Sequence, residues 1–208
     1  VLIMDEISAG LRYYAGGAHM VLHGAVRPDI AVFSNALGHG YAMAAVIGRK
    51  DVMEAAQMTF ISSTNWTERV GPTAALATLK KYRRENAAAQ LNRHGARILA
   101  AWKSLGEKYG FAVHVAGMEA MGHFSFDEPD FLAYKAYYVQ SMLEQGILAS
   151  NLCYMMLAHT DDDINRYIAA SDAAFAVIAE AIDIGERPAR RKGRVAFSGT
   201  NRNANRKC

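Results

Sequence analysis

The chain has 208 residues, of which 51% are hydrophobic and 21% charged. This is enough for one large domain or a medium domain with a small one, and it excludes a wholly disordered chain. The formal net charge is +3, but residues 186–208 hold eight Lys or Arg against one Glu, or +7, so the other 185 residues carry −4. A basic tail can bind nucleic acid, but we favour the interpretation of solvated charge.

Cys153 and Cys208 are the two cysteines, which is too few for a disulfide framework, and the ten Met suit a reducing compartment. We therefore expect a cytoplasmic protein. No run of about 18 uncharged apolar residues predicts a membrane span, and residues 1–4 lack the basic flank of a signal peptide. Because the sequence opens on a strand-like run without an initiator Met, we expect it to begin partway through a longer chain.

Short apolar runs at Val1–Met4, Ile30–Phe33 and Ala44–Gly48 predict strands, the first two of them buried as in a parallel sheet. Longer periodic segments predict helices. The expected helices cover residues 49–57, 71–82, 86–109, 130–145 and 160–182, and further strands are expected at 111–115, 122–126 and 147–149. This order predicts part of an α/β sheet, followed by an α+β domain from about Asn86.

Three places could carry chemistry. Asp5 ends the first strand, where open parallel sheets bind ligands, and its carboxylate could pair with a cationic ring nitrogen; a surface acid or a helix cap is the alternative. The glycine-bearing loop 34–41 could bring backbone close to a ligand, although a tight turn is the simpler interpretation. The hydroxyl-rich segment 62–67 precedes a helix and suits a phosphate, although capping explains it equally well.

The histidines point to no metal site. His19 and His23 have a spacing that can bind zinc on a helix, but no third ligand is evident. No order of Ser, His and Asp singles out a nucleophile, and no phosphate-loop motif is present.

Several segments together resemble one family. Residues 5–12, Asp-Glu-Ile-Ser-Ala-Gly-Leu-Arg, are similar to the stretch Asp-Glu-Val-x-Thr-Gly-Phe-Arg of class III aminotransferases that use pyridoxal 5′-phosphate (PLP), of the glutamate-1-semialdehyde 2,1-aminomutase type. Further similarity runs through Pro28-Asp29-Ile30, Gly38 to Gly48, Thr64 with the helix that contains residues 75–79, and the closing stretch 193–199.

The resemblance covers the C-terminal half of the family and implies the fold of the PLP-dependent transferases, fold type I. Residues 1–85 would be the second half of the PLP-binding large domain, an α/β structure. Residues 86–185 would be an α+β C-terminal small domain, and residues 186–208 a basic tail.

The resemblance also implies roles for three residues. Asp5 would keep the pyridine nitrogen protonated, and Thr64 would bind the cofactor phosphate, in this family usually across a dimer interface. Asn35 stands where the family has the lysine that binds PLP covalently and later moves a proton. Asparagine has no amine and no useful base at neutral pH. Lys50, the next lysine, is expected at a helix start, away from the site.

The favoured interpretation is therefore part of a PLP-dependent aminotransferase or aminomutase that acts on an amino acid, a semialdehyde or an amino or keto sugar, with Asn35 in place of the lysine. We expect a homodimer with small-molecule amino donors and acceptors, and neither nucleic acid nor membrane as a partner. A first alternative is an inactive pseudoenzyme that binds PLP non-covalently or serves as a structural partner. A second is an unrelated module whose residues 186–208 give salt-dependent nucleic-acid binding.

Overall fold

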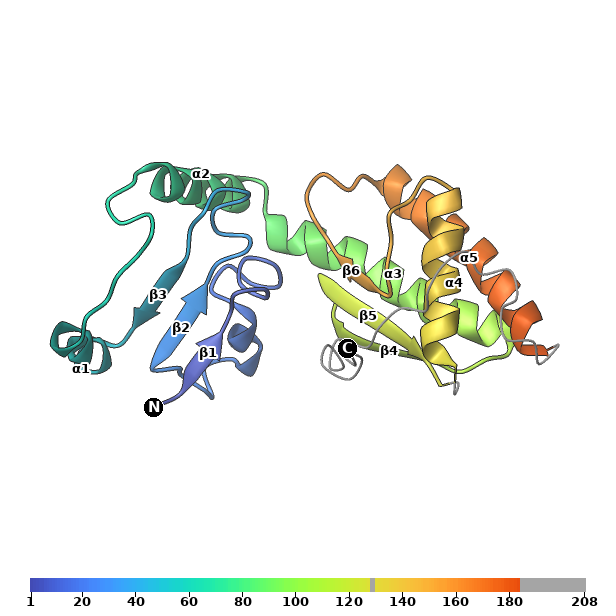
Figure 1. Ribbon diagram of the computed structural model, residues 1–208, viewed down its shortest axis with the longest axis horizontal. Helices are drawn as coiled ribbons and strands as arrows, with labels where there is room; N and C mark the ends of the chain where they lie inside the picture. The colour runs from blue at the N-terminus through green and yellow to red at the C-terminus, as the bar shows by residue number, and fades with distance from the viewer. Residues whose placement is uncertain (128–129, 184–208) are drawn as a thin grey trace, which may run out of the picture. The chain divides into compact units, whose positions relative to one another are not determined.

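The computed structural model describes residues 1–127 and 130–183. The chain divides into two compact units, residues 1–92 and 93–208, and the division falls within helix α3 (Ala87–Tyr109). Each unit has its own three-stranded sheet, as Figure 1 shows. The two units are described in turn, beginning with the one that carries Asp5 and Asn35.

The sheet of unit 1 has the strand order β1-β2-β3. Strand β1 (Ile3–Asp5) runs parallel to β2 (Ile30–Phe33), and β2 runs antiparallel to β3 (Ala45–Gly48). All three predicted strands are confirmed. Because the register places Asp5 beside Val32, the chain leaves β1 and β2 at the same edge of the sheet. The loops that follow these two strands therefore start close together.

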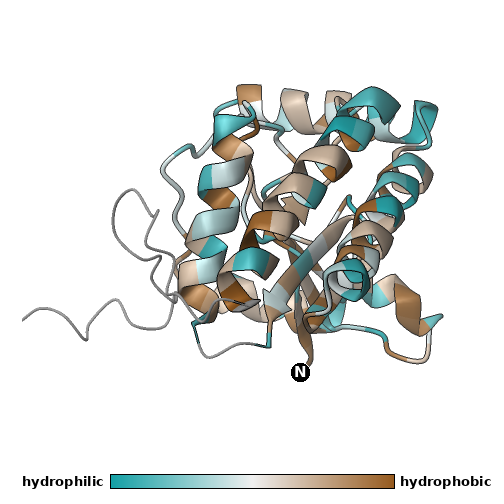
Figure 2. Ribbon diagram, turned by 90° about the vertical axis from the view of Figure 1, so that its right-hand side faces the viewer, coloured by the Kyte–Doolittle hydropathy of each residue, from teal (hydrophilic) through white to brown (hydrophobic). Residues whose placement is uncertain are grey.

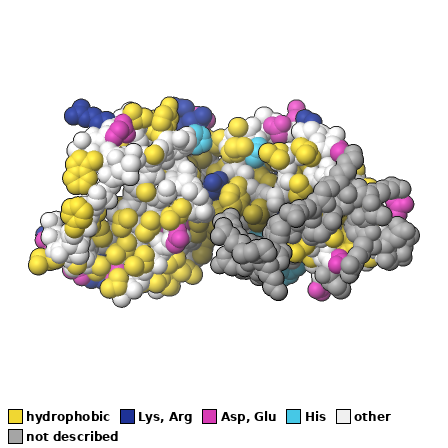
Figure 3. Space-filling model, viewed as in Figure 1, with side chains coloured by type: hydrophobic (Ala, Val, Ile, Leu, Met, Phe, Trp, Pro, Cys, Tyr) yellow, Lys and Arg dark blue, Asp and Glu magenta, His cyan; other side chains and the backbone are white. Residues whose placement is uncertain are grey.

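The prediction that the first two strands are buried is wrong for this chain. The exposed fraction is 89% at Val1 and 58% at Ile3, and among the residues of β1 and β2 only Ala31 is buried. The reason is that a three-stranded sheet has two edge strands, and β1 is one of them. Figure 3 shows hydrophobic side chains gathered on the visible face of unit 1. The apolar runs thus predicted where the strands are but not how deeply they are buried.

Short helices connect these strands in unit 1. The chain forms a 3₁₀ helix, η1, at Ala18–Leu22, and the predicted helix after β3 is one α-helical turn, α1 (Lys50–Met53), continued by the 3₁₀ helix η2 (Glu54–Met58). Helix α2 (Val70–Arg84) buries Ala75 and Tyr82. Asn86, with a φ of 47°, then turns the chain into α3.

Unit 2 packs helices on one face of an antiparallel sheet. Its strands are β4 (Val113–Met118), β5 (Met121–Phe126) and β6 (Leu152–Tyr154), in that order, and its helices are α3, α4 (Phe131–Glu144) and α5 (Asp161–Asp183). The ring of Phe124 in β5 is fully buried, and its centre lies 4.9 Å from Trp102 of α3, 5.0 Å from Tyr138 of α4 and 5.8 Å from Phe175 of α5. Each helix in Figure 2 accordingly carries both hydrophobic and hydrophilic stretches.

The helix ends of unit 2 explain why one prediction is confirmed, the start of α5, and why another is wrong, the strand at 147–149. At the start of α5 the backbone N–H of Asp163 donates to the Thr160 hydroxyl, and the Asp163 carboxylate accepts from the Thr160 N–H, which confirms the predicted helix start. The strand predicted at 147–149 is wrong. Gly146 closes α4 in a Schellman motif in which the Ile147 N–H donates to the Met142 carbonyl, so that amide belongs to the helix end and the strand begins later.

Candidate functional site

At the carboxyl edge of β1 and β2, the loops that follow these two strands come into contact. The amide Nδ2 of Asn35 donates to the Ser8 hydroxyl at 3.1 Å, so the loop after β1 is joined to the loop after β2. Asp5 keeps its carboxylate at the strand end, where Oδ1 accepts the Ile7 N–H at 2.9 Å. Within the described residues Oδ2 of Asp5 accepts no hydrogen bond, and the side chain is exposed. An exposed carboxylate oxygen and a fixed amide therefore share one edge of the sheet.

A buried carboxylate holds the loop that follows Asp5. Glu6 is 1% exposed, and its two carboxylate oxygens accept the backbone N–H groups of Ala18 at 2.7 Å and His19 at 2.9 Å. One of them also lies 2.7 Å from Nδ1 of the His19 ring. Gly17 has a φ of 105°, and a Cβ there would lie 2.5 Å from the Glu6 carboxyl carbon. The glycine therefore makes room for the carboxylate that ties residues 6 and 19 together.

Sequence analysis missed both Glu6 and Ser8. Successive side chains of a strand point to opposite faces, so the pair Asp5-Glu6 after an apolar run places one carboxylate outward and the next inward. That alternation, with the glycine pair at 16 and 17, is the signal that could have found Glu6. No signal in the sequence marks Ser8, because its contact depends on how two separate loops meet.

The glycine-bearing loop 34–41 is a pair of tight turns, as the simpler interpretation predicted. The Leu37 N–H donates to the Ser34 carbonyl and the Tyr41 N–H to the Gly38 carbonyl. The Ser34 hydroxyl donates to the Met43 carbonyl at 3.1 Å and closes the loop. A Cβ at Gly38 would collide with the Tyr41 carbonyl, so this position requires glycine for a close backbone approach.

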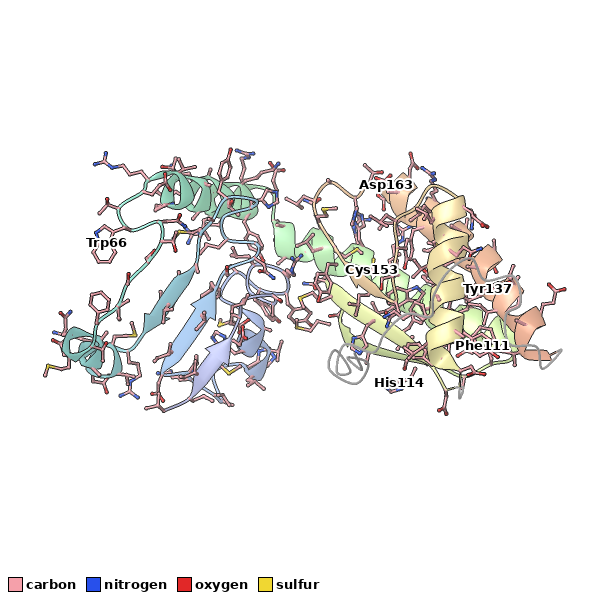
Figure 4. The ribbon with its side chains drawn as sticks, viewed as in Figure 1. Trp66, Phe111, His114, Tyr137, Cys153 and Asp163 are labelled. Carbon is pink, nitrogen blue, oxygen red and sulfur yellow. The ribbon has the colours of Figure 1, made fainter. Side chains whose placement is uncertain are left out.

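Thr64 lies in an exposed segment and is not joined to Asp5 or Asn35. Within the described residues its hydroxyl makes no hydrogen bond, and the whole run from Gln57 to Val70 is exposed. Trp66 is 69% exposed, and Figure 4 shows it at the outer margin of unit 1.

The helix start after Thr64 is already capped. The Glu68 carboxylate accepts the N–H groups of Val70 and Gly71 at 2.5 Å and 3.2 Å. Capping therefore explains the start of α2 better than a phosphate site does, and a carboxylate provides the cap instead of the hydroxyls of residues 62–67.

Other candidates are placed away from this edge. Lys50 begins α1 just after β3, and because Gly48 at the end of β3 pairs with Ile30 at the start of β2, Lys50 lies near the edge of the sheet opposite to Asp5. His19 contacts Glu6, and His23 ends η1. In residues 1–127 and 130–183 no group of three or more His, Cys, Asp or Glu could hold a metal ion.

An ion-paired carboxylate stabilises the sheet at the other ends of its strands, away from Asp5. Asp29 accepts the Leu2 N–H at 2.7 Å and pairs with Arg49 at 2.9 Å. The hydrogen bond from Leu2, together with the charge of Arg49, lowers the pKa of Asp29. This pair joins the starts of β1 and β2 to the end of β3, so it holds the register that aligns Asp5 with Val32.

Comparisons with known proteins agree with this fold. The model of the family "Aminotransferase class-III" matches residues 1–173. The 3-aminobutyryl-CoA aminotransferase of Cloacimonas acidaminovorans (strain Evry) is 30% identical over 79% of this chain and 41% of its own length. The glutamate-1-semialdehyde 2,1-aminomutase of Chlorobaculum tepidum is 30% identical over 82% of this chain and 43% of its own.

Solved structures of transaminases share the fold. The FumI protein of Sphingopyxis sp. MTA144, solved in its PLP internal aldimine form, is 22% identical with a TM-score of 0.78 and covers 87% of this chain and 44% of its own. A β-phenylalanine aminotransferase from Variovorax paradoxus is 23% identical with a TM-score of 0.73, over 88% and 45%. The chain thus spans less than half the length of the relatives it matches. The predicted family and fold type are confirmed, and the predicted cofactor is the one that the FumI structure names.

Proposed function

Because this chain belongs to the class III aminotransferase family, we propose that it forms part of a PLP site in an aminotransferase or aminomutase. The observation that supports this most is the shared edge of β1 and β2. An exposed carboxylate, Asp5, and residue 35 follow two neighbouring parallel strands there. Residues 1–85 would be the second half of the PLP-binding large domain, and residues 86–185 the small domain. The substrate would be an amino acid, a semialdehyde or an amino or keto sugar.

The residues present suit the pyridine nitrogen and the phosphate of this cofactor, but not its covalent link. When bound, PLP supplies an electron sink for bond breaking at the α-carbon of an amino substrate. The free Oδ2 of Asp5 is suited to hold a proton on the pyridine nitrogen, since a carboxylate stabilises a nearby cation. The Thr64 hydroxyl can donate to a phosphate oxygen. Residue 35 does not fit a covalent link, because asparagine carries no amine.

A second copy of the chain would bring Thr64 to this site. Within one chain Thr64 is exposed and makes no hydrogen bond in the described part, and it is flanked by large exposed apolar side chains. The exposed fraction is 93% at Phe60, 63% at Ile61 and 69% at Trp66. A surface of this kind is typical of a protein interface. It supports the expected homodimer, in which the segment 57–70 of one copy would face the edge of β1 and β2 in the other.

The second candidate function is a pseudoenzyme that binds the cofactor without a covalent bond, and Asn35 is the observation that favours it. An amide side chain can neither attack the cofactor aldehyde nor take up a proton at neutral pH. Lys50 cannot replace it from the opposite edge of the sheet.

The described helices include none long and apolar enough to cross a membrane. The cytoplasmic location stays a prediction from the cysteine and methionine content.

Reductive trapping tests the site. The longest natural chain that contains these residues, and its Asn35→Lys variant, would be incubated with PLP, reduced with borohydride and mapped by mass spectrometry. We expect an adduct at residue 35 in the lysine variant only. If that variant binds PLP while residue 35 stays unmodified, the assignment of residue 35 is wrong.

Asp5 is tested in the same lysine background. Asp5→Ala should reduce transaminase activity by far more than it changes the midpoint of urea unfolding, because its one hydrogen bond is local and exposed. Asp51→Ala is the matched control, since Asp51 is an exposed carboxylate of the same unit whose partner is Arg49. Equal activity with and without the Asp5 carboxylate would remove Asp5 from the mechanism.

A further inference from the structure

We propose that the pair Asn35–Ser8 makes this site bind the amine form of the cofactor, pyridoxamine 5′-phosphate, in preference to the aldehyde form, PLP. The inference rests on the proposed function, because it takes residue 35 to face the carbon of the cofactor that the family's lysine binds. It adds a preference between two chemical forms of one ligand and names Ser8 as the residue that sets it.

The hydrogen bond to Ser8 fixes what Asn35 can offer. One N–H of the amide donates to the Ser8 hydroxyl at 3.1 Å, and within the described residues the amide oxygen Oδ1 accepts no hydrogen bond. The side chain is exposed, so Oδ1 is available to a ligand. Ser8 is itself held, since its carbonyl accepts Nε of Arg12 at 2.8 Å. The amide is therefore anchored at its nitrogen end and presents an acceptor.

The two cofactor forms differ at the group that would meet this acceptor. The amine of pyridoxamine phosphate is protonated at neutral pH and has three N–H donors, whereas the aldehyde oxygen of PLP can only accept. A hydrogen bond from an ammonium to the amide oxygen is charge-assisted and about twice as strong as a neutral one. The aldehyde can use only the second N–H of the amide, a neutral donor at the end already held by Ser8.

The usual advantage of the aldehyde is also missing. In a lysine site the aldehyde form is retained by a covalent bond that the amine form cannot make. With Asn35 no such bond forms, so the aldehyde form loses this advantage. The Asp5 carboxylate is assigned to the pyridine nitrogen, which both forms share, and it does not discriminate between them. The amide acceptor and the missing covalent bond therefore both favour the amine form.

Calorimetric titration of three ligands tests this on the longest natural chain that contains these residues. The ligands are pyridoxamine 5′-phosphate, PLP and 4′-deoxypyridoxine 5′-phosphate, which has a methyl group in place of the amine or aldehyde. The buffer contains no primary amine, and borohydride with mass spectrometry corrects for PLP attached to surface lysines. We expect the amine form to bind about tenfold or more tightly than the methyl form, which corresponds to one charge-assisted hydrogen bond. PLP should bind more weakly than the amine form.

Variants separate the roles of the two residues. Asn35→Leu should bring the ratio of amine to methyl affinity close to one. Ser8→Ala frees the amide to turn its N–H groups toward the ligand, so the ratio of amine to PLP affinity should fall. Thr73→Ala is the matched control, because its hydroxyl donates to the carbonyl of Arg69, the residue before α2, and not to Asn35 or Ser8. Its ratios should equal those of the unchanged chain.

The outcomes distinguish this inference from the proposed function. Non-covalent PLP binding as tight as or tighter than pyridoxamine phosphate, with Asp5→Ala weakening both, would overturn the preference and leave the cofactor site standing. If none of the three ligands binds, both proposals fail. The comparison of ligands on the unchanged chain tests the preference for the amine form even if a variant does not fold.

Discussion

Replacing Glu6 with glutamine tests how firmly the loop behind Asp5 is held. The substitution keeps the size of the side chain but removes its charge and turns one acceptor oxygen into a donor nitrogen. Glu6 is 1% exposed, and both of its oxygens accept backbone N–H groups, from Ala18 at 2.7 Å and from His19 at 2.9 Å. Whichever way the new amide turns, its NH₂ group faces a half-buried N–H that has lost its acceptor.

The cost follows from that mismatch. Losing one hydrogen bond to a charged group, and leaving its half-buried partner unsatisfied, costs about 1.5–3 kcal/mol in the free energy of unfolding. Glu54→Gln is the matched control, because Glu54 is an exposed carboxylate of the same unit, and it should change stability by less than about 0.5 kcal/mol.

Urea unfolding with a probe in unit 1 measures this difference, and hydrogen exchange locates it. Protection of the Ala18 and His19 amides should fall in Glu6→Gln, while protection in β5 should stay unchanged because β5 belongs to the other unit. If Glu6→Gln unfolds at the same urea concentration as Glu54→Gln, the carboxylate does not anchor this loop.

Two further predictions concern unit 2. Gly95→Ala should destabilise the protein by about 2 kcal/mol or more despite its better helix propensity, because a Cβ there would collide with the Glu119 carbonyl; a higher unfolding midpoint would contradict this. Burial lowers the pKa of His159, so its contribution to stability is present above the unfolded pKa of about 6.5 and is lost as pH falls through the lower folded pKa. His159→Gln should therefore flatten the loss of stability as pH falls below about 6.5, which unfolding at stepped pH would measure, and an unchanged slope would assign that loss to other groups.

Local patterns predicted the elements well where the chain itself determines them. The strand Ile30–Phe33 has the bounds that its apolar run predicts, and Thr160 starts α5 because its hydroxyl and the Asp163 carboxylate satisfy each other's backbone N–H groups. The failure at 147–149 has a local cause as well. Three apolar residues after a glycine resemble a strand, but the glycine that ends α4 takes the first amide of that run into the helix end.

Burial could not be predicted from the same patterns. An apolar run indicates a strand that can be buried on both faces, yet exposure depends on what lies beside it. Val1 and Ile3 are exposed in β1, an edge strand, whereas Phe124 in β5 is covered by aromatic rings from three helices. The difference comes from the number of elements that pack on each strand, which is a property of the whole fold.

In the candidate site too, some features could be predicted from the sequence and others could not. Asp5 and Asn35 could be placed at one edge from sequence, since each follows a strand and parallel neighbours end together. The contact between Asn35 and Ser8 could not, because it depends on the paths of two loops. Under the proposal that Asn35 takes the place of the family's lysine, that contact changes what residue 35 can offer a ligand. A lysine replaced by a free asparagine would only lose chemistry, whereas an asparagine anchored by Ser8 presents a defined acceptor. Since Glu6 anchors the loop that carries Ser8, the proposed ligand preference of residue 35 would depend on a buried carboxylate that does not touch it.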